Sequence, residues 1–279
     1  MIVTFVPSPL AGEGRGEGES QERKMKKNRV KEAIEKGKVA LGPFMKFTDP
    51  ASVEIAGKAG FDFVIIDMEH GPVSVETAQN LIRAAELVDI TPIIRVTENE
   101  PGLILRALDI GAGGVEVPQI GNKDDALRLV QSSKFAPQGS RGVCRFVRAA
   151  DYSASDRYRY FEDANKETII IPHIEGTKGI SNLEEILSVK GLDIIFVGPY
   201  DLSQSLNIPG QVEDPKVVEK MREVVSISQK AGLAVGTFVD DVKAAKKWIA
   251  EGVQYISFSV DVGIFYEACK SIVKELKEM

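Results

Sequence analysis

Short apolar runs alternate with segments of helical periodicity along this chain, from residue 39 to residue 277. The apolar runs are rich in β-branched residues, which is typical of strands buried in a parallel sheet. They occupy residues 39–47, 63–68, 92–96, 114–120, 168–175, 193–198, 234–239 and 255–260. The helical segments occupy residues 51–59, 75–88, 101–110, 123–134, 180–189, 215–231, 242–251 and 263–277. Eight strands and eight helices over about 250 residues predict an α/β fold of the (β/α)8 TIM-barrel type.

An open, doubly wound sheet also alternates strands with helices. The first predicted strand, however, is not followed by the GxGxxG motif that dinucleotide-binding sheets carry at that point. The barrel is therefore the preferred prediction.

The first two dozen residues differ from the rest of the chain. Residues 7–20 are rich in Gly, Pro, Ser and Glu and have no apolar period, so they cannot bury enough surface to offset their ordering entropy. We expect residues 1–24 to be a disordered amino-terminal extension and residues 25–279 to be a single (β/α)8 domain. We also hypothesise that Met25 is the natural initiator, in which case the extension is not translated.

The composition limits the kinds of molecule that the chain is expected to bind. The formal net charge of −6 and a pI near 5.3 argue against a nucleic-acid-binding surface. No apolar stretch reaches the ~18 residues that a membrane span needs, so we expect no membrane partner. The two cysteines, Cys144 and Cys269, lack metal-ligand spacing, and such sparse cysteines indicate a cytoplasmic location.

Two predicted neighbouring strands lead into acidic residues. One strand ends at Glu175, and the other is followed closely by Asp201. Barrel enzymes place their chemistry at the carboxyl ends of the strands, and carboxylate oxygens suit Mg²⁺ or Mn²⁺. We therefore predict that Glu175 and Asp201 share one divalent cation; ordinary salt bridges are the alternative.

Both histidines of the chain also follow or end predicted strands. His70 is the best candidate for proton transfer, because the unperturbed pKa of histidine lies near neutrality. His173 precedes Glu175 by two residues, so the two side chains share one face of a strand. We predict that His173 contacts the substrate or a metal-bound water, and a role as third metal ligand is a less favoured alternative.

Arg95 ends an apolar strand, where its guanidinium fork would suit an enolate or carboxylate oxygen. Structural pairing with Asp67 or Asp109 is the alternative. Asp67 ends the preceding strand and belongs to the same group of candidates. Asp109 lies late in a predicted helix, where it could orient a histidine or could simply be solvated.

Two further segments are candidates for substrate binding. Gly198, Pro199 and Tyr200 precede Asp201 at a turn where backbone N–H groups can approach a carboxylate. Residues 137–166 are predicted to be one long irregular segment, which in a compact domain is usually functional or mobile. Its arginines either recognise a distal substrate carboxylate or are solvated at the surface; they include Arg141, Arg145 and Arg148.

From residue 28 to residue 276 the sequence resembles the HpcH/HpaI aldolase family, metal-dependent pyruvate aldolases of the phosphoenolpyruvate/pyruvate superfamily. The most specific segments are Phe61-Asp-Phe-Val-Ile-Ile-Asp-Met-Glu-His-Gly-Pro72, Pro137-Gln-Gly-Ser-Arg-Gly-Val143 and Val197-Gly-Pro-Tyr-Asp-Leu-Ser-Gln-Ser-Leu206. Two positions depart from the family pattern. His173 stands where the family often has glutamine, and Tyr200 where it often has a small residue.

The resemblance implies a role for each matching residue. His70 is the implied proton acceptor, Arg95 the implied enolate stabiliser and Asp109 the residue that raises the basicity of the histidine. Glu175 and Asp201 are the implied ligands of Mg²⁺, Mn²⁺ or Co²⁺, and the backbone amide of residue 200 is the implied substrate contact.

The implied reaction is reversible cleavage of a 4-hydroxy-2-oxo acid to pyruvate and an aldehyde, catalysed by an aldehyde-lyase of the metal-dependent class. The implied partners are a small 2-oxo acid and an aldehyde. A homo-oligomer is also implied, a hexamer built of dimers that exchange their eighth helix. The alternatives are a related lyase acting on an acyl-CoA ester or a phosphonate-type substrate, and a non-catalytic barrel that binds a 2-oxo acid.

Overall fold

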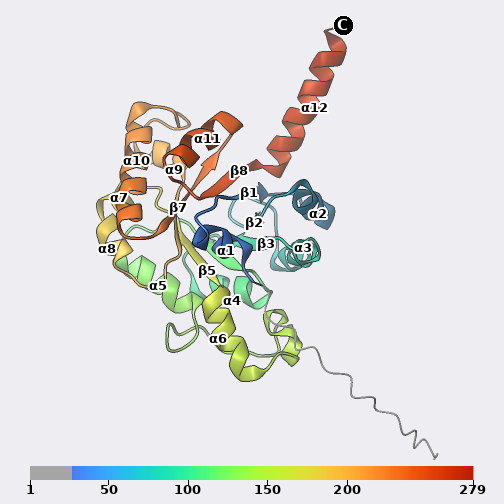
Figure 1. Ribbon diagram of the computed structural model, residues 1–279, viewed down its shortest axis with the longest axis vertical. Helices are drawn as coiled ribbons and strands as arrows, with labels where there is room; N and C mark the ends of the chain where they lie inside the picture. Colours follow the sequence, from blue (N-terminus) through green and yellow to red (C-terminus); the bar gives the residue numbers. More distant parts are fainter. Residues whose placement is uncertain (1–26, 279) are drawn as a thin grey trace, which may run out of the picture.

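The computed structural model describes residues 27–278, and a sheet of eight parallel strands lies at its centre (Figure 1). The order of the strands is β5-β4-β3-β2-β1-β8-β7-β6. Each strand overlaps one of the eight predicted strands. The strands are β1 (Ala40–Met45), β2 (Phe63–Asp67), β3 (Thr91–Arg95), β4 (Gly114–Val117), β5 (Ile169–Pro172), β6 (Ile194–Val197), β7 (Ala234–Val239) and β8 (Tyr255–Val260). The predicted disorder of residues 1–24 lies outside the described residues.

The first and last strands in this order, β5 and β6, meet and close the sheet. The N–H of Ile174 donates to the carbonyl of Phe196 over 2.7 Å, and the N–H of Asp193 donates to the carbonyl of Ile170 over 3.0 Å. His173 and Phe196 also form a parallel bridge. The closure confirms the predicted (β/α)8 barrel.

Helices surround the barrel, and those between strands return the chain from the end of one strand to the start of the next. Several begin at a side chain that accepts a helix N–H, as at Asp49, Ser74 and Asp241. The predicted helix 180–189 is two short helices, because Asn182 between them is not helical. The helices are α2 (Pro50–Ala59), α3 (Val75–Leu87), α4 (Pro101–Asp109), α5 (Lys123–Ser133), α7 (Thr177–Ser181), α8 (Leu183–Leu187), α10 (Pro215–Lys230), α11 (Val242–Ala250) and α12 (Asp261–Lys277).

The prediction that residues 137–166 are irregular throughout is wrong. They contain the 3₁₀ helix η1 (Arg148–Ser153) and most of α6 (Arg157–Glu167). The sequence of α6 is strongly polar, and few of its residues, among them Tyr160 and Ala164, are buried apolar ones. An apolar period that short gives no helical signal. Two further short helices, α1 (Arg29–Glu35) and α9 (Pro199–Ser205), were also not predicted.

The molecule has an inner and an outer apolar layer. The inner layer fills the barrel, and Phe44, Phe63 and Phe196 are among its largest side chains. Val30 of α1 packs against this inner cluster, so α1 closes the amino-terminal end of the barrel. The outer layer lies between strands and helices. With the amino-terminal end covered in this way, the opposite end remains as the place where side chains can meet a ligand.

The last helix, α12, projects away from the barrel (Figure 1). None of its described residues is buried, although it carries Phe265, Ile272 and Leu276. Within residues 27–278, no helix has both the length and the apolar character that crossing a membrane requires.

Candidate active site

Arg95, which is partly buried, forms an ion pair with the fully buried Asp67 at the carboxyl ends of β3 and β2. The two residues are register partners on adjacent strands. The Nε of Arg95 donates to Oδ1 of Asp67 over 3.0 Å, and its Nη2 donates to Oδ2 over 2.8 Å. Such a two-point contact fixes the plane of the guanidinium.

The third nitrogen of the same guanidinium faces another acid. Nη1 of Arg95 lies 3.2 Å from Oε2 of Glu69, and its Cζ lies 4.5 Å from the centre of the Phe44 ring. Burial alone would lower the pKa of Arg95, but Asp67 and Glu69 outweigh burial and raise it. Arg95 therefore stays charged and rigid, with Nη1 turned toward Glu69.

Asp67 also organises the loop that carries His70. It accepts the backbone N–H groups of Glu69 (3.1 Å) and His70 (3.2 Å). Burial would raise the pKa of Asp67, but the hydrogen bonds and charge of Arg95 prevail and hold it below its usual range. The ring of His70 is 59% exposed, and its Nε2 lies 3.9 Å from Oε2 of Glu69. The side chain of His70 is therefore accessible to a substrate, and the backbone that carries it is fixed by Asp67.

Glu175 and Asp201 lie across the seam between β5 and β6. Oε1 of Glu175 accepts the backbone N–H of Gln119 over 2.8 Å. A Cβ built on Gly198 would lie 2.8 Å from Oε2 of Glu175 and 3.8 Å from Oδ2 of Asp201, so these oxygens are separated by no more than the sum, 6.6 Å. The bare Cα of Gly198 keeps open the space beside both carboxylates.

The electrostatics of these acids show a local excess of negative charge. Burial raises the pKa of Asp201, and the neighbouring Glu175 raises it further. Burial and Glu175 also raise the pKa of Glu69. For Glu175 burial acts in the same direction, but the contacts of His173 and Gln119 outweigh it and lower the pKa. Carboxylates that repel one another in this way favour a bound cation.

Neither Glu69 nor Glu116 was among the predicted site residues. Glu69 could have been found from the sequence, because it lies beside His70 in the segment that follows a predicted strand. Glu116 is fully buried on β4 and contacts His173, and only its acidic character within an apolar strand could have pointed to it. The residues of the described chain include no group of three or more His, Cys, Asp or Glu side chains arranged to hold a metal ion.

His173 does not line the open end of the barrel. It is 1% exposed, and its ring stacks on Phe196 at 4.3 Å. Nε2 lies 3.1 Å from Oε2 of Glu116, and Nδ1 lies 3.3 Å from Oε2 of Glu175. Burial would lower the pKa of His173, but the two carboxylates prevail and raise it to about 9. The shared face with Glu175 was correctly expected, but the face is the barrel interior, so a direct substrate contact is not supported.

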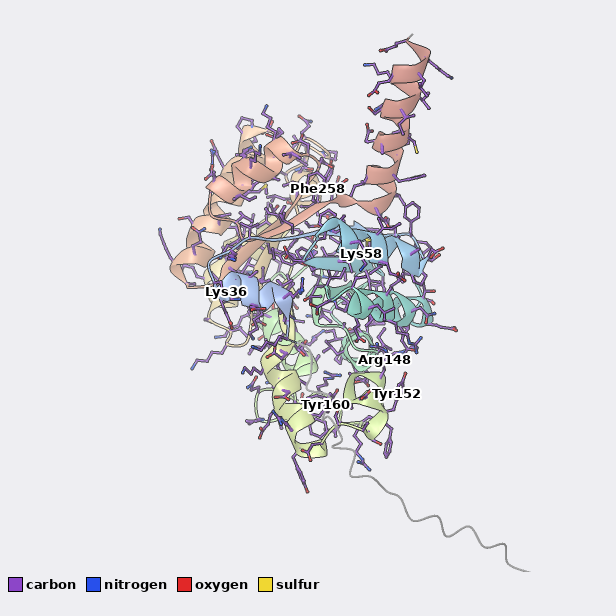
Figure 2. The ribbon with its side chains drawn as sticks, turned by 45° about the vertical axis from the view of Figure 1, so that its right-hand side comes forward. Lys36, Lys58, Arg148, Tyr152, Tyr160 and Phe258 are labelled. Atoms are coloured by element: carbon purple, nitrogen blue, oxygen red, sulfur yellow. The ribbon has the colours of Figure 1, made fainter. Side chains whose placement is uncertain are left out.

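Asp109 lies away from His70 within the same chain. It is the last residue of α4, the helix that returns to the amino-terminal start of β4, and it binds Nη2 of Arg141 over 2.6 Å. Arg148, in the same region, binds Glu86 and the carbonyl of Ile110. In one chain, therefore, Arg141 and Arg148 hold the fold at the far end and do not face the acids of the site. Figure 2 shows Arg148 in the half of the molecule away from α12.

The segment before Asp201 frames the site on its other side. Gly198 is the N-cap of α9, and Pro199 and Tyr200 follow in its first turn. The hydroxyl of Tyr200 donates to Oδ2 of Asp240 over 2.9 Å, and its ring meets Phe238 edge to face. Partial burial and Asp240 raise the pKa of Tyr200 to about 12. Its side chain thus lies across the rim toward β7.

Fold and site together define a barrel enzyme with a fixed arginine and an accessible histidine beside surplus carboxylates. A family model described as HpcH/HpaI aldolase/citrate lyase matches residues 41–268. The chain belongs to this family, which confirms the resemblance and the predicted class of carbon–carbon lyase.

Individual relatives agree with this assignment. The chain is 31% identical to a hydroxypyruvate/pyruvate aldolase of Roseobacter denitrificans, over 90% of this chain and 98% of that protein. It is 32% identical to a 2-keto-3-deoxy-L-rhamnonate aldolase of Salmonella paratyphi B, over 90% and 94%. A crystal structure of a protein of the family from Burkholderia cenocepacia superposes with a TM-score of 0.85 at 32% identity, over 90% of this chain and 99% of the other.

Proposed function

We propose that this chain is a divalent-metal-dependent aldolase that reversibly cleaves a 4-hydroxy-2-oxo acid to pyruvate and an aldehyde. The observation that carries the proposal is the pair of carboxylates, Glu175 and Asp201, beside the space that Gly198 leaves open, with the charge of Arg95 close enough to act on both. Family membership and the aldolase relatives support the same reaction class.

Glu175 and Asp201 are the residues that we propose as ligands of Mg²⁺, Mn²⁺ or Co²⁺. They fit such an ion because both are oxygen donors, both border the space kept open by Gly198, and Asp201 has a pKa raised by its neighbour. A bound divalent ion would polarise the ketone of the 2-oxo acid and favour the enolate.

Arg95 supplies the second positive charge. Asp67 holds its Nε and Nη2. Nη1 lies 3.2 Å from Glu69 and has a second hydrogen, which it can donate to an oxygen that becomes anionic as the C3–C4 bond breaks. Because the guanidinium is already fixed, it needs little reorganisation during the reaction.

His70 is the residue that we propose as acceptor of the C4 hydroxyl proton. Its ring is exposed, and Asp67 fixes its backbone. Asp109 of the same chain lies at the other end of the barrel, so the orienting role implied for it requires a second copy to bring its Asp109 to His70. The backbone at Gly198, Pro199 and Tyr200 remains the proposed contact for the substrate carboxylate, since these residues precede Asp201 at the rim.

Pyruvate proton exchange tests this function without knowledge of the aldehyde. Metal-free enzyme with pyruvate in deuterium oxide should show no loss of the methyl NMR signal, and added Mg²⁺, Mn²⁺ or Co²⁺ should start the exchange. Glu175→Gln and Asp201→Asn should abolish it. Exchange that persists in EDTA, or inactivation by borohydride with pyruvate, would show a Schiff-base enzyme and sink the proposal.

Proton exchange and an assay of substrates together separate the alternatives. A non-catalytic barrel that binds a 2-oxo acid would give no exchange with any metal, and a lyase for acyl-CoA esters would act on such esters but not on 4-hydroxy-2-oxo acids. The aldolase relatives make both alternatives less well supported.

A panel of aldehydes offered with pyruvate, and with hydroxypyruvate as second nucleophile, then defines the substrate. Succinic semialdehyde, tartronate semialdehyde, lactaldehyde and glyceraldehyde differ in charge and in hydroxyl groups. The ranking of kcat/KM among them identifies which polar end the site recognises.

We also propose that the chain forms a homo-oligomer through α12. This helix exposes Phe265, Ile272 and Leu276, among other apolar residues, and buries none of its described residues, and exposed apolar surface of this kind marks an interaction site. Light scattering of the full chain should give a mass above 30.4 kDa, and Phe265→Glu with Ile272→Glu should lower it. A monomer at micromolar concentration would contradict the proposal.

The predicted cytoplasmic location is retained as part of the proposal, and both cysteines are free.

A further inference from the structure

A chain of four buried polar side chains runs from the centre of the barrel to Glu175. The hydroxyl of Tyr255 on β8 donates to Oε1 of Glu116 on β4 over 2.8 Å. The other oxygen of Glu116 lies 3.1 Å from Nε2 of His173, whose Nδ1 lies 3.3 Å from Oε2 of Glu175. Tyr255, Glu116 and His173 are each no more than 1% exposed, and Glu175 is 7% exposed.

Aromatic stacking fixes both rings of this chain. Tyr255 stacks on Phe63 with ring centres 4.2 Å apart and planes 10° apart. His173 stacks on Phe196 at 4.3 Å and 22°. Because both rings are clamped, Glu116 is held between two partners that cannot rotate away, and His173 presents Nδ1 to Glu175 in one direction.

Glu175 is consequently held on both oxygens by the protein. Oε1 accepts the N–H of Gln119, a residue with φ of 58°, and Oε2 is held by His173. A non-glycine residue in this left-handed region is uncommon and is retained where the surroundings enforce it. These two contacts restrict the rotation of the carboxylate, and Oε2 lies beside the space that Gly198 leaves open.

We propose that His173, Glu116 and Tyr255 are positioning residues that lock the Glu175 carboxylate in the orientation in which it binds the divalent cation. This inference rests on the proposed function, because it takes Glu175 as a metal ligand. Groups that hold a ligand in place contribute to metal affinity without touching the ion. An imidazole suits the task because its two nitrogens can join two carboxylates, whereas the glutamine common at this position in the family has only one nitrogen.

The test measures Mn²⁺ affinity without substrate, by electron paramagnetic resonance of free Mn²⁺ with the full-length protein. His173→Leu should raise the dissociation constant about 10- to 100-fold. His173→Gln, which keeps one donor, should restore part of the affinity, and Tyr255→Phe should weaken binding by a smaller factor. At saturating metal the KM for the 2-oxo acid should stay unchanged.

A double-mutant cycle separates positioning from general destabilisation. If Tyr255 acts through His173, Tyr255→Phe should have no further effect on Mn²⁺ binding once His173 is Gln. Tyr160→Phe is the matched control, because it removes the same hydroxyl from a buried tyrosine of α6 that packs in a separate cluster with Phe135. It should leave the Mn²⁺ constant within twofold of wild type.

The outcomes distinguish this inference from the proposed function. Wild-type protein that binds no Mn²⁺, or Glu175→Gln that binds it equally well, would overturn the metal site itself. Loss of binding in Glu175→Gln, together with unchanged binding in folded His173→Leu and Tyr255→Phe, would overturn only the positioning role. Circular dichroism of each metal-free variant establishes that it is folded.

Discussion

The two ends of the barrel contain the same ion pair in different surroundings. Arg95 binds Asp67 at the carboxyl end, and Arg141 binds Asp109 at the amino-terminal end, with closest contacts of 2.8 and 2.6 Å. Each arginine also lies 4.5 Å over a phenylalanine ring. An arginine–aspartate ion pair of this kind therefore does not by itself distinguish an active site from a purely structural contact.

The neighbouring charges make the difference. Around Arg95 stand Glu69, Glu175 and Asp201, and the pKa of two of these acids is raised. Near Arg141 two acids are each paired with an arginine, since Arg148 binds Glu86 as Arg141 binds Asp109. A surplus of acids attracts a cation, whereas balanced pairs stabilise packing. We infer that the carboxyl end is specialised for chemistry and the amino-terminal end for stability.

Exchanging each arginine for lysine tests this division most strongly. Arg95→Lys keeps the charge but loses the fork, and we expect kcat to fall about 10³-fold, or about 4 kcal/mol in transition-state stabilisation. The matched variant Arg141→Lys should keep kcat within about twofold while lowering the melting temperature. Steady-state kinetics at saturating metal, with calorimetry of both variants, measure the contrast.

Both variants could also lose kcat to the same extent. If Arg141→Lys lost as much kcat as Arg95→Lys in a folded protein, the far end would take part in catalysis, through a neighbouring copy. Repeating the assay with mixed oligomers of the two variants would then reveal recovery of activity.

The sequence predicted the barrel and the residues at the carboxyl ends because strand pattern and strand end are both local features. His70, Arg95, Glu175 and Asp201 all lie at that end, as expected. Asp109 differs: its position late in a helix left an orienting role and a solvated side chain open, and only the resemblance favoured the orienting role. A residue that ends a helix returns toward the amino-terminal end of a barrel, and this consequence of the predicted topology could have been drawn from the sequence.

The inward contacts of the site could not be predicted in the same way. The stacking of His173 on Phe196 and the bond from Tyr255 to Glu116 depend on which strands face each other across the barrel. Strand alternation gives the face of a side chain but not its partner on the opposite wall. The polar helix α6 was missed because its contacts, not its pattern, hold it in place.

Breaking the Arg141–Asp109 pair should lower the stability of the protein more than its activity. Arg141→Ala leaves Asp109 half-enclosed without its partner, and we expect a loss of about 3 kcal/mol in the free energy of unfolding. Urea unfolding measures this loss, and Mn²⁺ affinity should be unchanged. A variant as stable as wild type would show that the pair does not hold the end of the barrel together.

A buried lysine at the same end gives a pH test of its structural character. Lys134 donates to the carbonyls of Asn165 and Thr168, and burial lowers its pKa to about 8. Between pH 8 and its unfolded pKa of 10.5 the unfolded chain binds more protons, so its contribution to stability rises with pH. From pH 7 to pH 10 this gain should be about 2.5 kcal/mol. Lys134→Met should lack the gain, as urea unfolding at several pH values would show; an identical pH dependence in both proteins would contradict the assignment.

The smallest expected effect probes the open space at the carboxyl end. Gly198→Ala places a Cβ 2.8 Å from Oε2 of Glu175, tighter than real contacts allow, so the carboxylate or the backbone of residue 198 must shift from its position. We expect Mn²⁺ affinity to fall about tenfold, which corresponds to about 1.4 kcal/mol. Gly102→Ala is the matched control, because a Cβ there meets no atom within 4 Å and the residue lies in the helix α4. Equal Mn²⁺ affinity of the two variants would mean that the cation does not bind beside Gly198, and the contrast between the two ends would then have to rest on Arg95 alone.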